Sequence, residues 1–430
     1  MAGAPDSPAA KVRPILDAAG ALSRVLQERA DARISAVMTR TADVVVIGGG
    51  ANGTSTAFHL SLLGVRNVVL LERRHLAAGA TGKSGALVRM HYTNEHESRL
   101  AFESLKVFRN FGEIVGGDCG FEGVGFLQLV GHGHADALRR NVERQRKLGI
   151  ATRALAPGDL AEILPGVQTR DIGAAAWEPD SGFADPSATA FAFAEGARRR
   201  GATIETGVEV QRVLTEGGRV TGVETRAGRI ATPSVVVAAG AWSTPLLSPL
   251  GLDYPLTPHR IQVSIFRWPA GFTRRHPAVI DSVHAAWWRP EGTASTLIGV
   301  ELGSGHADPE KFDESVDASY VGICHAALGG RWPLMSPALM RGGWAGMIMM
   351  SADGRPIIDR IGPDGLWGML GDSGTSFKTS PAIGRCLAEW IVTGAPSTVD
   401  LHPFRASRFA EGRPWQDADH YGGQSLTISR

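Results

Sequence analysis

The sequence is poor in cysteine, and its cysteines show no paired spacing. Cys119, Cys324 and Cys386 are odd in number and far apart in a chain of 430 residues. This pattern argues against a disulfide framework and against a zinc site. We therefore expect no metal and a reducing, cytoplasmic location.

Long apolar runs and an excess of one charge are also missing. No stretch reaches the roughly 18 apolar residues that a membrane span requires. The 44 basic and 43 acidic residues give a formal net charge of +1, which offers no electrostatic footprint for nucleic acid. Neither a membrane nor a nucleic acid is an expected partner. The length of 430 residues predicts two joined domains.

The two ends of the chain are predicted to be extensions of this globular part. Residues 11–38 are predicted to form an amphipathic surface helix within an N-terminal helical extension, residues 1–40, with an interaction arm as the alternative. Acidic residues in this segment argue against a transit peptide. Residues 396–430 are expected to form a C-terminal tail, which is polar and poorly ordered from residue 411 onward.

A glycine-rich turn follows the first apolar run of the globular part. Residues 43–47 read as a strand covered on both faces, and a helical pattern then runs to Gly64. Between them, Gly48, Gly50 and Gly53 stand at G-x-G-x-x-G spacing. A second buried strand, "NVVLLE", ends at Glu72. This strand–turn–helix–strand pattern predicts a dinucleotide site.

Each of these positions has a mechanical reason. Gly48 permits the tight turn, Gly50 lets the backbone approach a pyrophosphate, and Gly53 lets helix and strand pack closely. The helix N-terminus supplies amides and a partial positive charge. Glu72 would accept hydrogen bonds from the adenosine ribose and repel a 2′-phosphate. The turn alone does not distinguish NAD from FAD.

Two segments of the sequence interrupt the predicted nucleotide-binding domain. The predicted nucleotide-binding segments are residues 41–85, 176–250 and 346–395. Residues 86–175 and 251–345 are irregular or rich in β-prone segments bordered by proline, as expected for an antiparallel substrate sheet.

Four motifs in this order resemble the FAD-dependent D-amino-acid oxidase superfamily, and within it the sarcosine oxidase and dimethylglycine dehydrogenase branch. They are "VVVIGGGANGTSTAFHL", "AAGATGKSGALVR", "VVVAAGAWS" and "GDSGTSFKTSPAIGRCLAEW". The resemblance implies an α/β fold with a glutathione-reductase-like, Rossmann-type FAD-binding domain and an inserted antiparallel-sheet substrate domain. It also implies that the cofactor is FAD.

The resemblance further implies which residues bind the cofactor. Gly48, Gly50, Gly53 and Glu72 would hold the adenosine diphosphate, with Arg73 next to them. The turn with Thr81, Lys83 and Ser84 would lie near the isoalloxazine. Val210 would meet the adenine, and Gly240 would line the cofactor. Gly374, Thr375 and Ser376 would begin the late helix, whose amides and dipole would stabilise negative charge on the reduced flavin.

Two basic residues fall where the sarcosine oxidase group binds the substrate carboxylate. These are Arg89, in "GALVRMHY", and Lys378, in "SGTSFKTS". Together they would form an anion clamp, because a guanidinium binds a carboxylate through two hydrogen bonds and an ammonium adds a second charge. The clamp would hold the α-carbon over the flavin N5, and Lys378 would also contact the cofactor.

The chain departs from this family pattern in three places. "WAGMIMMSADGRPIID" lacks the cysteine that tethers FAD in monomeric sarcosine oxidases, and "GFADPSATAFAF" lacks the histidine that carries FMN in heterotetrameric relatives. We therefore expect noncovalent FAD and no FMN. "STLIGVEL" lacks the lysine thought to assist oxygen, so either Lys83 substitutes for it or electrons leave to another acceptor.

The expected reaction is oxidation of the C–N bond of an amino acid or N-alkyl amino acid. Hydride would pass to the flavin N5, and the resulting imine would hydrolyse. The partners are then a small amine or amino acid and O2 or another acceptor, and an oligomer is possible. His259 or His284 would tune the protonation of the amine. Because neighbouring strand residues face opposite ways, only one of Trp287 and Trp288 can face the substrate.

Three other functions stay open at this level. A flavin-dependent 2-hydroxy-acid dehydrogenase would use the same clamp. An aromatic hydroxylase, which also carries Gly-Asp before a helix, would consume NADPH. An electron-passing FAD subunit of a larger amine dehydrogenase complex is the third.

Overall fold

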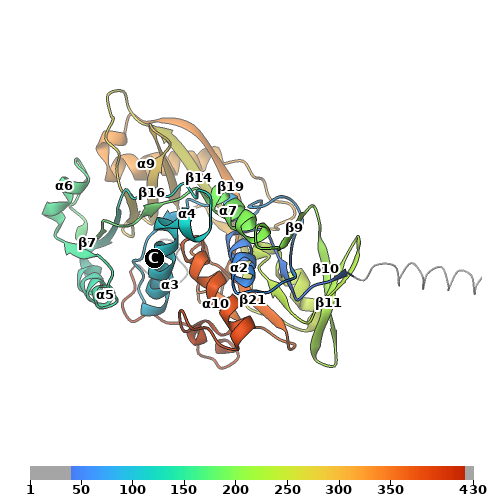
Figure 1. The fold of residues 1–430 in the computed structure, drawn as a ribbon. Helices are drawn as coiled ribbons and strands as arrows, with labels where there is room; N and C mark the ends of the chain where they lie inside the picture. Colours follow the sequence, from blue (N-terminus) through green and yellow to red (C-terminus); the bar gives the residue numbers. More distant parts are fainter. Residues whose placement is uncertain (1–39, 422–430) are drawn as a thin grey trace, which may run out of the picture.

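The computed structural model describes residues 40–421 of the chain (Figure 1). The helix predicted for residues 11–38 therefore lies outside the described residues, as do residues 422–430. The described chain combines a parallel sheet layered with helices and a large, mostly antiparallel sheet, which confirms the expected fold class.

The first large sheet carries the predicted glycine turn. Its six strands lie in the order β20-β21-β13-β2-β3-β9, and all neighbours are parallel except β20 and β21. The bounds are β2 Val44–Ile47, β3 Val68–Glu72, β9 Thr203–Thr206, β13 Val235–Val237, β20 Ile357–Arg360 and β21 Leu366–Leu370.

The β-branched run in β2 is buried because both faces of this sheet are covered. Val44 and Val46 pack toward a helix layer, whereas Val45 and Ile47 pack against a smaller sheet. The helix layer contains α2 Ala51–Leu62, α3 Glu95–Arg109, α7 Pro186–Arg198 and α10 Ser380–Thr393. The smaller sheet has the order β1-β12-β11-β10, with β1 Arg40–Thr41, β10 Val210–Glu216, β11 Arg219–Thr225 and β12 Gly228–Ala231. This alternation explains the absence of polar positions in β2.

The second large sheet has nine strands and is antiparallel except at the β15–β5 pair. Its path is β18-β14-β17-β16-β15-β5-β7-β6, with β19 paired to β14. The bounds are β5 Phe126–Gly131, β6 Arg153–Leu155, β7 Ile172–Glu178, β14 Leu256–Arg267, β15 Ala278–Asp281, β16 Ala286–Glu291, β17 Ser295–Val300, β18 Gly305–His306 and β19 Leu339–Ser351. The helices α5 Ala135–Lys147 and α9 Ala318–Arg331 pack on it. The remaining short elements are α4 Phe111–Ile114, α6 Leu160–Ile163, α8 Thr244–Leu247 and the β4 Leu87–Val88 and β8 Gly182–Phe183 pair.

Some of the domain borders predicted from the sequence fall within strands. The suggested borders at residues 176 and 346 fall inside β7 and β19, both of which belong to the nine-stranded sheet. The helix α3, which the sequence placed with the substrate sheet, packs on α10 in the helix layer. The division of the chain into two domains stays a proposal.

The expectation of a poorly ordered tail from residue 411 is wrong for residues 415–421, here called the C-terminal strap. Tyr421 is 2% exposed, and Asp419 is buried. Alternate strap residues face inward, where Asp417 pairs with Arg355 and Asp419 pairs with Arg144. Ion pairs to distant parts of the chain give no local sequence signal, so the segment read as a polar tail.

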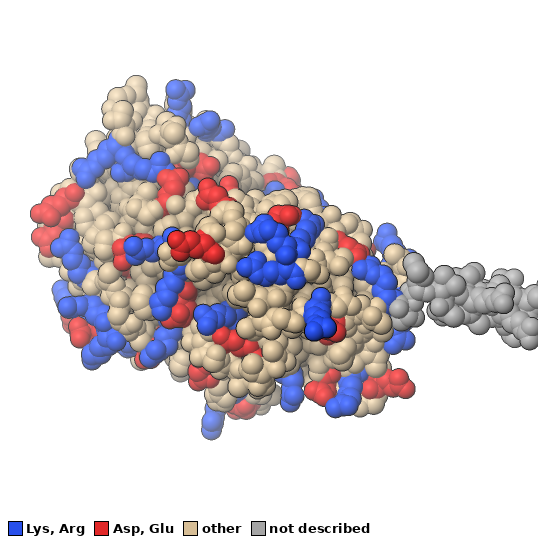
Figure 2. All heavy atoms as spheres, viewed as in Figure 1, with Lys and Arg blue, Asp and Glu red and all other residues tan. Residues whose placement is uncertain are grey.

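The surface shows no segregation of charge on the face in view, where acidic and basic side chains are interspersed (Figure 2). Among the described residues, no helix has both the length and the apolar character needed to cross a membrane.

Candidate active site

A cavity of about 520 Å³ runs from the carboxyl ends of β2 and β3 to the nine-stranded sheet, where residues of β14, β16 and β17 line it. One end, here called the nucleotide end, is lined by Gly48, Gly50, Glu72 and Val210. The other end, here called the clamp end, is lined by Arg89, Trp287 and Lys378. Ligands of parallel sheets bind outside the carboxyl ends of the strands, which is where this cavity opens.

The glycine turn has no room for side chains. Gly48 has a φ of +113°, and a Cβ added there would lie 2.4 Å from the carbonyl oxygen of Ala238. A Cβ on Gly53 would lie 2.0 Å from the carbonyl oxygen of Gly48. Gly53 therefore lets α2 pack on the turn and does not itself line the cavity. Gly50 is the N-cap of α2 and exposes the first turn of the helix to the cavity.

Glu72 and Arg73 lie at the end of β3, as predicted. The carboxylate of Glu72 accepts hydrogen bonds from the backbone amides of Gly49 at 2.7 Å and Arg74 at 2.8 Å, which fixes its orientation beside the turn. Arg73 lines the cavity, but its guanidinium is paired with Glu310 at 2.7 Å and lies over the Trp242 ring. Binding of ribose by Glu72 stays a prediction.

The residues of the turn at η1, Thr81–Lys83, and the adjacent Ser84 differ in whether an ion pair engages their side chains. Thr81 and Ser84 line the cavity, and the Thr81 hydroxyl accepts a hydrogen bond of 3.0 Å from the amide of Ala51 at the start of α2. Lys83 also borders the cavity, but its Nζ is 2.7 Å from the carboxylate of Glu314 and its side chain is 27% exposed. Gly240 lines the cavity on the other side.

The late glycine turn differs from the expectation at one point. Gly374, Thr375 and Ser376 do not begin the helix, because α10 starts at Ser380 after the 3₁₀ turn η7, Phe377–Thr379. Pro381, with its fixed φ, is suited to the first helical turn and places the start there. Gly374 and Ser376 line the cavity, whereas Thr375 does not.

Arg89 and Lys378, predicted to form a clamp, are both buried and lie on the same aromatic ring. Arg89 is 1% exposed and Lys378 6%. The Arg89 guanidinium carbon is 4.5 Å from the centroid of the Tyr92 ring, and the Lys378 Nζ is 5.2 Å from it. Lys378 donates a hydrogen bond of 3.0 Å to the Thr375 carbonyl, which also accepts one from the Tyr92 hydroxyl. Such cation–π contacts orient both cations in the cavity wall.

Tyr92 is a site residue that the sequence analysis missed. It follows Arg89 by three residues in "GALVRMHY", so the only local signal was an aromatic residue close to the arginine. Its contact with Lys378 joins segments far apart in the sequence, and no local pattern reports such a contact.

Two buried carboxyl groups with raised pKa values lie near the late glycine turn and the clamp. Burial raises the pKa of Asp372, which lines the cavity, to about 6. Burial also raises the pKa of Glu178 in β7 to about 7. The Glu178 carboxylate accepts hydrogen bonds from the amide of Met90 at 2.9 Å and the hydroxyl of Ser181 at 2.7 Å.

The two candidate histidines do not lie at the clamp end. His259 faces a second cavity with Tyr254, Glu301 and Ser351, and its pKa is lowered by burial and by the neighbouring His306. His284 is hydrogen-bonded to Asp281 at 2.9 Å, which raises the pKa of the histidine. Neither side chain lines the cavity that holds Arg89.

The tryptophan pair in β16 divides as predicted. Trp287 lines the clamp end, whereas Trp288 is 0% exposed within the core of the nine-stranded sheet. The Trp287 ring fits between two glycines, because a Cβ on Gly85 would lie 2.2 Å from it and a Cβ on Gly299 would lie 2.6 Å from it.

Comparison with known proteins gives consistent similarities. The family profile described as "DAO: FAD dependent oxidoreductase" matches residues 43–390. The chain is 27% identical to sarcosine oxidase subunit beta of Arthrobacter sp over 86% of this chain and 91% of that protein. It is 28% identical to human mitochondrial sarcosine dehydrogenase over 86% of this chain, but spans only 41% of that longer protein. The crystal structure of L-proline dehydrogenase from P. horikoshii superposes with a TM-score of 0.80 at 27% identity, covering 88% of this chain and all of that one.

Proposed function

This chain belongs to the DAO family of FAD dependent oxidoreductases, and from that premise we propose that it oxidises the C–N bond of an N-alkyl or cyclic amino acid. Membership confirms the resemblance inferred from the four motifs, and with it an FAD-dependent enzyme. One observation carries the carboxylate of the proposed substrate: Arg89 and Lys378 are buried in the wall of the same cavity as the glycine turn.

The residues of the nucleotide end fit FAD. The absence of side chains at Gly48 and Gly50 exposes backbone amides and the start of α2, where a pyrophosphate is favoured. Within residues 40–421, no cysteine, histidine or tyrosine lines the cavity. This supports the proposal that FAD is held without a covalent bond.

The proposed chemistry assigns binding and orientation to the chain. Arg89 and Lys378 bind the substrate carboxylate, and Trp287 forms a wall that limits the group on the amine or the α-carbon. FAD, when bound, supplies the acceptor for the hydride that leaves the α-carbon. As the hydride leaves, the nitrogen lone pair forms the C=N bond of an iminium ion. The iminium ion loses its N–H proton to water, and the imine then adds water and splits into a carbonyl compound and an amine.

Neither candidate histidine supplies an acid–base group to the clamp end, because His259 and His284 lie elsewhere. The amine binds in its neutral form after losing its proton to solvent. The names of these relatives support the substrate class, because sarcosine and proline are both secondary amines with a carboxylate.

Anaerobic bleaching of the flavin tests this function directly. The holoenzyme is mixed with sarcosine, L- and D-proline, primary amino acids, 2-hydroxy acids and dimethylamine, and the flavin absorbance is followed. We expect secondary amino acids to reduce the flavin fastest and dimethylamine, which lacks the carboxylate, to be slow. Reduction by 2-hydroxy acids alone, or only by NADPH, would overturn the proposal.

The ion pair of Lys83 bears on the electron acceptor. Because its ammonium is neutralised by Glu314 at 2.7 Å, Lys83 is poorly placed to assist oxygen. We propose that electrons pass to an acceptor other than O2. Admitting air to the substrate-reduced enzyme should reoxidise the flavin more slowly than a dye acceptor does, and rapid peroxide formation would contradict this.

A further inference from the structure

We propose that Tyr421, in the C-terminal strap, is a positioning residue that holds Arg89 in its carboxylate-binding orientation through His91. This inference rests on the proposed function, because it assigns a purpose to the clamp. It adds to the site a segment that lies more than 30 residues beyond Lys378 in the sequence.

The contacts form a continuous path from the strap to the guanidinium. The Tyr421 hydroxyl lies 2.9 Å from Nε2 of His91, and the two rings stack with centroids 5.7 Å apart. The backbone carbonyl of His91 accepts a hydrogen bond from Nη1 of Arg89. Tyr421 and His91 are 2% and 0% exposed, so water does not compete for these contacts.

The hydroxyl of Tyr421 is itself fixed from the opposite side. Asn141 on α5 donates a hydrogen bond of 2.6 Å to it and another of 2.8 Å to the carbonyl of Asp419. Asp419 in turn pairs with Arg144 of the same helix at 2.8 Å. The helix α5 therefore sets the position of the strap against His91.

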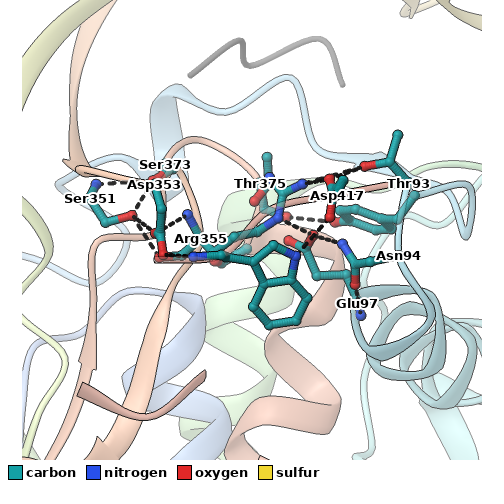
Figure 3. Close-up of polar contacts among 12 residues, drawn as sticks. Thr93, Asn94, Glu97, Ser351, Asp353, Arg355, Ser373, Thr375 and Asp417 are labelled. Carbon is teal, nitrogen blue, oxygen red and sulfur yellow. Dashed lines mark hydrogen bonds and ion pairs between the residues drawn. The ribbon is translucent and has the colours of Figure 1, made fainter. Parts of the chain in front are cut away.

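A second attachment holds the other end of the segment that carries Arg89. The carboxylate of Asp417 contacts both the hydroxyl of Thr93 and the guanidinium of Arg355 (Figure 3). Nε of Arg355 lies 2.9 Å from the carboxylate of Glu97 on α3. The strap therefore contacts residues 89–93 at two points, His91 and Thr93.

The same network reaches the turn before Lys378. Asp353 accepts a hydrogen bond of 3.1 Å from the Arg355 amide and one of 3.1 Å from the Ser351 hydroxyl. The amide of Ser351 donates to the hydroxyl of Ser373 at 3.2 Å, beside the late glycine turn (Figure 3). The strap therefore connects to both halves of the clamp.

This arrangement has a functional consequence because an arginine side chain has many rotamers. Its binding of a carboxylate through two hydrogen bonds requires one orientation of the guanidinium plane. Contacts that fix that orientation before binding lower the entropy lost when the carboxylate binds. Loss of the Tyr421 hydroxyl should then weaken carboxylate binding specifically.

The test uses Tyr421→Phe with Tyr254→Phe as the matched control. The Tyr254 hydroxyl also makes a hydrogen bond, in this case to the backbone carbonyl of Ile361 at 2.6 Å, but Tyr254 does not line the cavity of the clamp. Acetate, benzoate and anthranilate are titrated into the wild-type holoenzyme by calorimetry, and the tightest is used with its amide as the uncharged probe. Thermal unfolding of each variant is recorded separately.

We expect Tyr421→Phe to raise the Kd of the carboxylate by about three- to tenfold, the effect of one hydrogen bond. The Kd of the amide, and both values in Tyr254→Phe, should stay at the wild-type level. An equal loss for carboxylate and amide, or no loss in Tyr421→Phe, overturns the positioning role. Arg89→Gln distinguishes failure of the Tyr421 hypothesis from failure of the proposed clamp. If this variant binds the carboxylate as tightly as the wild type, or if no probe binds the wild type, the proposed clamp is wrong.

Discussion

At the nucleotide end of the cavity, Gly48 and Gly53 allow backbone segments to approach each other closely. At the clamp end, by contrast, Arg89 and Lys378 place two buried charges in the cavity wall. The first end is specified by the absence of side chains, since a Cβ on either glycine would overlap a carbonyl oxygen. The second is specified by side chains whose surroundings come from distant segments, including α5 and the C-terminal strap.

The difference determines what each end tolerates. A backbone site has no rotamers to adjust, so one added methyl group should abolish it. A site of buried charges depends on neighbouring dipoles and rings, so each single change around it should lower the affinity for a carboxylate by a limited amount. Damage to one end should also leave the other intact.

The largest effect is expected at the nucleotide end. Gly53→Ala places a Cβ 2.0 Å from the carbonyl oxygen of Gly48, which forces α2 away from the turn. We expect a loss of about 3 kcal/mol in the free energy of unfolding and protein purified without flavin. The flavin absorbance relative to protein and denaturant unfolding measure the two quantities.

Gly64→Ala is the matched control for this change. Gly64 has a φ of +88°, but a Cβ there meets nothing within 4 Å. Its substitution should destabilise the protein by about 1 kcal/mol through backbone strain alone and leave the flavin content unchanged. A flavin-replete Gly53→Ala protein would show that the turn is not built as described.

The same contrast explains what the sequence could predict. The strands β2 and β3, the helix α2 and the glycine turn between them are encoded within about thirty consecutive residues, so periodicity and spacing predicted them. Strand alternation predicted that only one of Trp287 and Trp288 faces the pocket, and the structure identifies it as Trp287.

The clamp end was predictable only in part. Arg89 and Lys378 were found through the family resemblance, but the Tyr92 ring between them was not. The strap was missed because Asp417, Asp419 and Tyr421 are polar residues whose partners lie far away in the chain. His259 was expected to tune the protonation of the amine, yet its side chain faces the second cavity.

At the clamp end, Arg89→Gln should lower kcat/KM for a secondary amino acid by about a hundred- to thousandfold, because a buried charged partner of the carboxylate is lost. The rate of anaerobic flavin reduction measures this. Flavin content should stay at the wild-type level, since the nucleotide end is untouched. Dimethylamine is the control substrate, and its slow reduction rate should not fall further. Loss of flavin from this variant would show that the two ends are not separable.

Buried charge should also make the clamp end sensitive to pH. The pKa of Glu178 is raised to about 7 by burial, above its value in the unfolded chain, so its contribution to stability is present at low pH and is lost as pH rises through 7. This group alone should lower the free energy of unfolding by about 2 kcal/mol between pH 5 and pH 8. Glu178→Gln should remove that part of the pH dependence in urea titrations. Glu113→Gln, at an exposed position, should leave it unchanged, and an unaltered slope in Glu178→Gln would contradict the assignment.

The smallest expected effect concerns substrate size at the clamp end. Trp287→Leu removes the ring held between Gly85 and Gly299 and enlarges the cavity beside Arg89. The ratio of kcat/KM for N-ethylglycine over sarcosine should rise about tenfold, the discrimination that one methylene group allows. Trp288→Leu is the control, because that neighbour is buried in the core of the sheet. It should destabilise the protein by about 3 kcal/mol without changing the ratio. A changed ratio in Trp288→Leu alone would mean that packing within the nine-stranded sheet, rather than the ring in the cavity, sets the size limit.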